Sequence, residues 1–174
     1  NSLSNTISVF LGNGAGGFAP RVSYNSGVTP VAVALGDLDS DGALDAAVAN
    51  SGGSSVSVLR GVGNGTFEAA TNISTGTPSS VLVADLNRDL DMEVILGTGA
   101  IYDPTGTPFQ SSWGYSMSVA GFNVVDVNGD GWDDVVLSTT DGYVVALLMD
   151  AAGVAAPGYS FTGYELAGLS TGDF

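Results

Sequence analysis

The chain contains 174 residues, of which 44% are hydrophobic, so it is long and apolar enough to form a domain with a buried core. Eighteen acidic residues against three basic ones give a formal net charge of −15, which argues against nucleic acid or an anionic membrane as a partner. The absence of cysteine and histidine excludes disulfides, thiol nucleophiles, serine–histidine–aspartate triads and ordinary zinc sites.

Short runs rich in β-branched residues, bounded by glycine, asparagine, aspartate and serine, predict β-strands along the chain. No segment shows the sustained 3.6-residue periodicity of a capped helix. No apolar run approaches the roughly 18 residues of a membrane span, so we expect no membrane insertion. In chain order, the main predicted strands lie within 31–35, 46–49, 56–59, 81–84, 94–96, 122–125, 135–137 and 143–148.

The sequence repeats with a period of 40 to 50 residues. Three acidic loops, 37–45, 85–93 and 126–134, begin 48 and 41 residues apart. Segment 1–18 also matches 50–67 at a constant offset of 49 residues. Four short strands per period of about 45 residues is the pattern of a β-propeller blade. We therefore expect an all-β fold of about three and a half blades of four antiparallel strands, divided as 1–29, 30–78, 79–120, 121–165 and 166–174.

The acidic loops are candidate calcium sites. Their carboxylates or amides occupy alternate positions, and no lysine or arginine lies nearby in loops one and three to offset the repulsion between carboxylates. A hard dication removes that repulsion, and calcium takes six to eight oxygen ligands. The candidate ligands of loop one are Asp37, Asp39, Asp41, Asp45 and the Ala43 carbonyl, and those of loop three are Asp126, Asn128, Asp130, Asp134 and the Trp132 carbonyl.

Loop two departs from this pattern. Its candidate ligands are Asp85, Asn87, Asp89, Asp91 and Glu93, so a glutamate occupies the ninth position. Leu90 stands where the other loops have glycine, and Arg88 lies inside the loop. Either the turn differs or the calcium affinity is lower, so we expect two to three sites. None is an EF-hand, because the last acid comes at position nine and strands flank the loop.

Other motifs point to weaker possibilities. The glycine-rich segment 12–17 fits a dinucleotide-binding pattern, but no helix is predicted to follow it, which favours a turn between strands. No pair of acidic residues outside the loops is grouped for glycosidase chemistry. Trp132 and Trp113 could stack on sugars or pack between blades. Asn64 and Asn72 begin glycosylation sequons.

The D-x-D-x-D-G-x-x-D loop between two short apolar strands resembles the FG-GAP/VCBS repeat, the calcium-binding blade of integrin α-type propellers and many bacterial surface proteins. Segment 1–18 is similar to the stretch that follows this loop in the bacterial versions. The resemblance implies a calcium ion held by positions one, three, five and nine in the hairpin between the first two strands of a blade. Family propellers usually have six or seven blades, more than this chain supplies.

We therefore expect a segment of a longer polypeptide, or one completed by copies of itself. Pairing of the C-terminal strand with 7–11 would close a four-bladed ring, whereas strand exchange between subunits would give an open fibre. The expected role is a non-catalytic, calcium-stiffened, extracellular module of structural or adhesive function. Its expected partners are neighbouring repeats, copies of the same protein, glycans or other surface proteins. The alternatives are a lectin-like module and the accessory propeller of a secreted polysaccharide-degrading enzyme.

Overall fold

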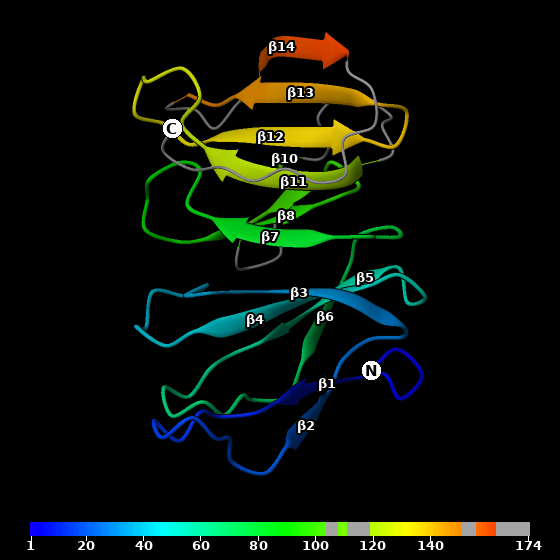
Figure 1. The fold of residues 1–174 in the computed structure, drawn as a ribbon, viewed down its shortest axis with the longest axis vertical. Helices are drawn as coiled ribbons and strands as arrows, with labels where there is room; N and C mark the ends of the chain where they lie inside the picture. The colour runs from blue at the N-terminus through cyan, green and yellow to red at the C-terminus, as the bar shows by residue number, and fades with distance from the viewer. Residues whose placement is uncertain (104–107, 111–118, 151–155, 163–174) are drawn as a thin grey trace. The chain divides into compact units, whose positions relative to one another are not determined.

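The computed structural model describes residues 1–103, 108–110, 119–150 and 156–162. These residues form fourteen β-strands and no helix (Figure 1). It follows that the described part of the chain holds no apolar helix of membrane-spanning length. The chain divides into two compact units, Asn1–Val81 and Leu82–Phe174.

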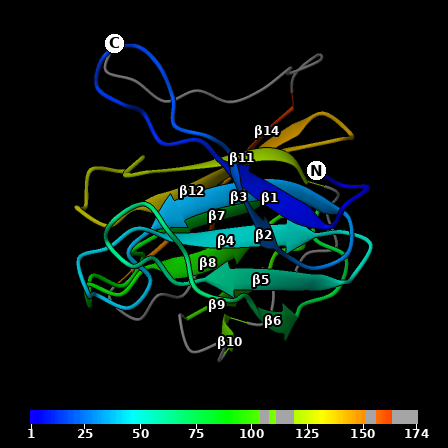
Figure 2. The ribbon, with the colours of Figure 1, turned by 90° about the horizontal axis from the view of Figure 1, so that it is seen from below.

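The first unit contains one two-stranded and one four-stranded antiparallel sheet. Strand β1 (Thr6–Val9) pairs with β2 (Val22–Asn25). The larger sheet consists of β3 (Pro30–Gly36), β4 (Asp45–Asn50), β5 (Ser55–Leu59) and β6 (Thr71–Ser74). These strands lie side by side in chain order, as Figure 2 shows.

The 49-residue repeat is visible in the connections of this unit. A single β-bridge joins Gly12 to Phe18 after β1, and an equivalent bridge joins Gly61 to Phe67 after β5. Within the first connection, the Asn13 side-chain oxygen accepts hydrogen bonds from the backbone N–H groups of Ala15 and Gly17. The glycine-rich segment 12–17 is thus a turn between strands, as its sequence context predicts.

From Val81 onward the chain forms two four-stranded antiparallel sheets. The first consists of β7 (Val81–Ala84), β8 (Glu93–Leu96), β9 (Ile101–Tyr102) and β10 (Pro108–Gln110). The second consists of β11 (Val119–Val125), β12 (Asp134–Thr139), β13 (Tyr143–Leu148) and β14 (Ala156–Thr162). The prediction of an all-β fold built from four-stranded antiparallel blades is confirmed.

The second strand of each four-stranded sheet is fully buried. Every residue of β4, β8 and β12 is buried, which explains why the stretches 46–49, 94–96 and 135–137 within them are apolar on both faces instead of alternating. In the first unit Ala46, Val48 and Leu59 form the core, against which Ile7 of β1 also packs. In the second unit the core consists of Leu86, Ile95, Ile101, Val135, Leu137, Leu147 and Met149.

This burial positions the acidic loops. Each loop joins the first strand of a sheet to its buried second strand: β3 to β4, β7 to β8 and β11 to β12. The ninth loop residue is therefore the first residue of a fully buried strand. Predictions that concern Trp113, the start of a further blade at 166–174 and the pairing of a C-terminal strand with 7–11 lie outside the described residues.

Candidate metal centre

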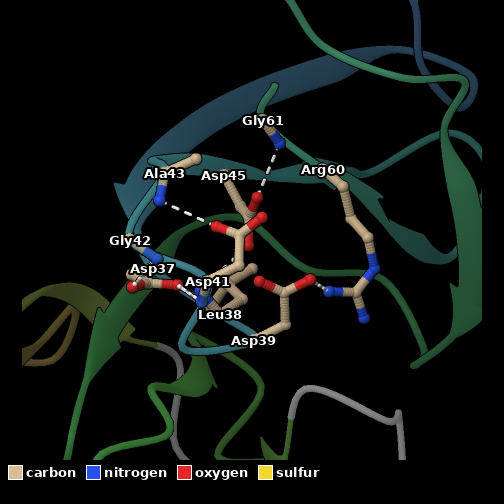
Figure 3. A network of polar contacts seen from close by, with 9 residues as sticks. All are labelled: Asp37, Leu38, Asp39, Asp41, Gly42, Ala43, Asp45, Arg60 and Gly61. Carbon is tan, nitrogen blue, oxygen red and sulfur yellow. Dashed lines mark hydrogen bonds and ion pairs between the residues drawn. The ribbon is translucent and has the colours of Figure 1, made fainter. Parts of the chain in front are cut away.

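Loop one folds back onto its first aspartate. The two carboxylate oxygens of Asp37 accept hydrogen bonds from the backbone N–H groups of Asp41 (3.1 Å) and Gly42 (2.9 Å), as Figure 3 shows. Asp41 in turn accepts a hydrogen bond from the N–H of Ala43 at 2.7 Å. Loops two and three repeat the hydrogen bond from the sixth loop residue to the first. Leu90 N–H donates to Asp85 (3.1 Å), and Gly131 N–H donates to Asp126 (2.9 Å).

All three loops share one backbone path. Their fourth and sixth residues have positive φ angles, namely Ser40 (56°) and Gly42 (87°), Arg88 (58°) and Leu90 (81°), and Gly129 (76°) and Gly131 (91°). Left-handed backbone costs an L-residue other than glycine roughly 1–2 kcal/mol. Loop two therefore keeps the turn of its neighbours in spite of Leu90 and carries backbone strain there. Of the two alternatives for this loop, a different turn is excluded.

The ninth residue of each loop is a buried carboxylate with backbone partners. Asp45 is fully buried, and its two oxygens accept hydrogen bonds from the N–H groups of Leu38 (2.9 Å) and Gly61 (2.6 Å). Asp134 is also fully buried and accepts from Val127 and Met149, both at 2.9 Å.

Glu93, the ninth residue of loop two, accepts a hydrogen bond from Leu86 N–H at 2.7 Å. In all three loops the ninth carboxylate thus ties the second loop residue down. In loops one and three it also holds a backbone N–H just past the third strand of the sheet: Gly61 is the second residue after β5, and Met149 is the first after β13. The sequence predicted these carboxylates as ligands but did not predict this structural role.

Burial also changes the acidity of Glu93. Desolvation raises the pKa of Glu93 from 4.5 to about 7, the charges of Asp89 and Asp85 add to the rise, and the hydrogen bond from Leu86 opposes it. Without a counter-ion, this carboxyl group is therefore partly protonated at neutral pH. A bound dication would favour the charged form.

Loop one brings three candidate ligands together. Carboxylate oxygens of Asp37, Asp39 and Asp45 all lie within 4.8 Å of one another, whereas Asp41 is outside this group. Among the described residues, loops two and three contain no such group of three carboxylates. For the Ala43 and Trp132 carbonyls, the ligand role stays a prediction.

The donor set fits calcium. Every candidate side-chain donor is an oxygen, which suits a hard dication, and the three converging carboxylates of loop one concentrate negative charge that a dication would compensate. In loop two, one carboxylate oxygen of Asp85 is buried and has no hydrogen-bond partner. A buried polar atom without a partner is costly, so a cation there would remove a penalty.

The expectation that no basic residue lies near loops one and three is wrong. The guanidinium of Arg60 forms an ion pair with Asp39, as Figure 3 shows. Arg88 of loop two lies 5.2 Å from the ring centre of Trp132 in loop three, in cation–π geometry. Both contacts join residues far apart in sequence, which loop-by-loop analysis cannot detect. Arg88 also occupies one face of the ring that we had considered for sugar stacking.

Comparisons with known proteins agree with the repeat pattern. The FG-GAP-like repeat family matches residues 1–48 and 37–96. A search of curated proteins finds no match.

Two solved structures show different degrees of likeness. The structure of BBS1N in complex with ARL6DN, soaked with lead, is 18% identical with a TM-score of 0.57. The match covers 87% of this chain and 43% of that one, so the likeness concerns the fold and less than half of that chain. The Vibrio cholerae biofilm matrix protein Bap1 is 16% identical with a TM-score of 0.37, and the match covers 78% of this chain and 28% of that one.

Proposed function

The chain belongs to the FG-GAP-like repeat family, and on this basis we propose that it is a non-catalytic, calcium-binding β-propeller module with a structural or adhesive role outside the cell. The observation that carries the proposal is the geometry of loop one. There, oxygens of Asp37, Asp39 and Asp45 converge within 4.8 Å at the start of a buried strand.

Calcium would act by electrostatics and by rigidity. In the absence of metal, the clustered carboxylates repel one another and are only partly compensated. A bound ion would remove this repulsion and fix the loop between the first two strands of each blade. At a calcium concentration 100 times Kd, each site would add roughly 2.7 kcal/mol to the free energy of unfolding. Two or three such sites would approach the whole stability of an ordinary domain, about 5–15 kcal/mol.

The extracellular address follows from the expected affinity. Calcium sites of extracellular modules typically have Kd values of about 10⁻⁴–10⁻³ M, and they fill only where calcium is abundant. The cytosol would leave such sites empty. Neighbouring repeats or copies of the same protein are the partners we propose, because rigid blades present their edges and faces in fixed positions.

Calorimetric titration with calcium tests the proposal directly. The wild-type chain, freed of metal, should bind two to three ions. Asp37→Asn should abolish the site of loop one, and Asp126→Asn that of loop three. Asp141→Asn removes an exposed carboxylate from the β12–β13 turn and serves as the control that should leave every site intact. Absence of binding heat in the wild type at millimolar calcium, with equilibrium dialysis also negative, would refute the proposal.

A further inference from the structure

Arg60 belongs to the blade of loop one (β3–β6) and differs from its counterpart in the blade of loop three (β11–β14). The two positions correspond because the residue after each donates its N–H to the ninth carboxylate: Gly61 to Asp45, and Met149 to Asp134. The preceding residue is therefore Arg60 in one blade and Leu148 in the other. The guanidinium of Arg60 therefore lies beside loop one, whereas the equivalent place at loop three carries no basic side chain.

The charge at the third loop position differs in the same way. Loop one has Asp39 there, and Arg60 forms an ion pair with it. Loop three has Asn128, which donates its amide N–H to Asp130 at 2.9 Å. The additional carboxylate of loop one is therefore accompanied by an arginine, and the neutral asparagine of loop three by a leucine.

Asp39 is also one of the three carboxylates whose oxygens converge in loop one. A metal ion at that point and the guanidinium of Arg60 would draw on the same carboxylate. We propose that Arg60 is a built-in competitor of the metal, which compensates loop one when calcium is absent and lowers its calcium affinity. This inference rests on the proposed calcium-binding function.

The size of the effect follows from exposure. The side chains of Arg60 and Asp39 are 41% and 28% exposed, so water screens the pair and its contribution stays in the range of surface ion pairs. Loss of the competitor should therefore tighten calcium binding by about fivefold, which corresponds to about 1 kcal/mol. High salt should reduce the difference, because it screens both the ion pair and the repulsion between guanidinium and metal.

Backbone amides give a separate readout for each loop. Gly42 and Gly131 occupy the same loop position and donate to Asp37 and Asp126 respectively, so their NMR resonances should each report their own site during a calcium titration. In Arg60→Gln, the Kd followed at Gly42 should fall about fivefold, while the Kd at Gly131 stays unchanged. Arg60→Met, which also removes the charge but keeps an unbranched stem, should behave in the same way.

Two controls separate competition from a general effect of charge. Arg21→Gln makes the same change in net charge at an exposed position of the same unit, and should leave the Kd at Gly42 unaltered. In an Asp39→Asn background, Arg60→Gln should have a much smaller effect, because the shared carboxylate is gone. Spectra in chelator verify that each variant is folded.

Three outcomes would overturn the inference. Weaker binding at Gly42 in Arg60→Gln would mean that Arg60 positions Asp39 for the metal. An unchanged Kd in both charge-removing variants would mean that the ion pair has no influence on the site. If neither Gly42 nor Gly131 responds to calcium in the wild type, up to about 10 mM, the proposed function itself fails, and the inference falls with it.

Discussion

Asp45→Asn tests whether the ninth loop position stabilises the protein without any metal. Asp45 is fully buried and accepts hydrogen bonds from Leu38 and Gly61. Asparagine retains one acceptor oxygen but places an amide N–H₂ against the second backbone donor. Hydrogen bonds to charged groups contribute about 1.5–3 kcal/mol, and an unsatisfied buried donor adds a desolvation penalty. We expect the variant to lose about 2–4 kcal/mol of unfolding free energy in chelator.

Urea unfolding in chelator, followed by circular dichroism, measures this loss, and hydrogen exchange should become faster at the Leu38 and Gly61 amides. The comparison variant is Asp39→Asn, which removes a carboxylate that is 28% exposed and has an ion-pair partner. It should change stability by no more than about 1 kcal/mol. If Asp45 served only as a metal ligand, neutralising it would relieve repulsion. A metal-free Asp45→Asn as stable as the wild type would therefore refute the reasoning.

Three further perturbations test the loops and the turns. In chelator, the free energy of unfolding of the wild type relative to Glu93→Gln should fall by about 3 kcal/mol as pH rises from 4.5 to about 7, and should then level off. The reason is that Glu93 ionises at a lower pH in the unfolded chain than in the folded one. A flat difference across a urea-unfolding pH series would contradict this. Leu90→Gly should raise the free energy of unfolding by about 1 kcal/mol, measured by urea unfolding, because glycine relieves the positive φ of 81°; a loss of stability would show that the turn is not strained. Gly61→Ala should lower the free energy of unfolding by about 1–3 kcal/mol in the same assay, because its Cβ would overlap the Leu44 carbonyl. Gly12→Ala, at the equivalent position with open space around it, should be nearly neutral. Equal effects of the two substitutions would count against the overlap.

The fold was predictable because its signals are local and repeated. Strands such as 46–49 and 135–137 are apolar on both faces, and the structure places both in fully buried strands. The acidic loops come with a fixed spacing, so the hairpin between the first and second strands of each blade followed from the sequence. The shared turn of loop two did not, because Leu90 has low intrinsic preference for the left-handed conformation that it adopts.

The parts of the site that sequence analysis missed depend on strand pairing. Arg60 reaches Asp39 across 21 positions because β4 and β5 are neighbours in the sheet. The backbone partners of Asp45 lie 7 positions before it and 16 positions after it. One sequence signal could have indicated such a partner: the chain has three basic and eighteen acidic residues, so each arginine is expected to lie near an acidic side chain. The spacing of residues alone does not specify which one.

Thermal unfolding of the chain in calcium, in magnesium and in chelator tests the central claim most directly. With two or three sites at 100 times their Kd, calcium should raise Tm by about 10 °C or more relative to chelator. Magnesium should have a much smaller effect, because it requires a tight octahedral site and retains its waters. An unchanged Tm in millimolar calcium would mean that the acidic loops are solvated turns, and it would contradict both the calcium-binding role and the extracellular address.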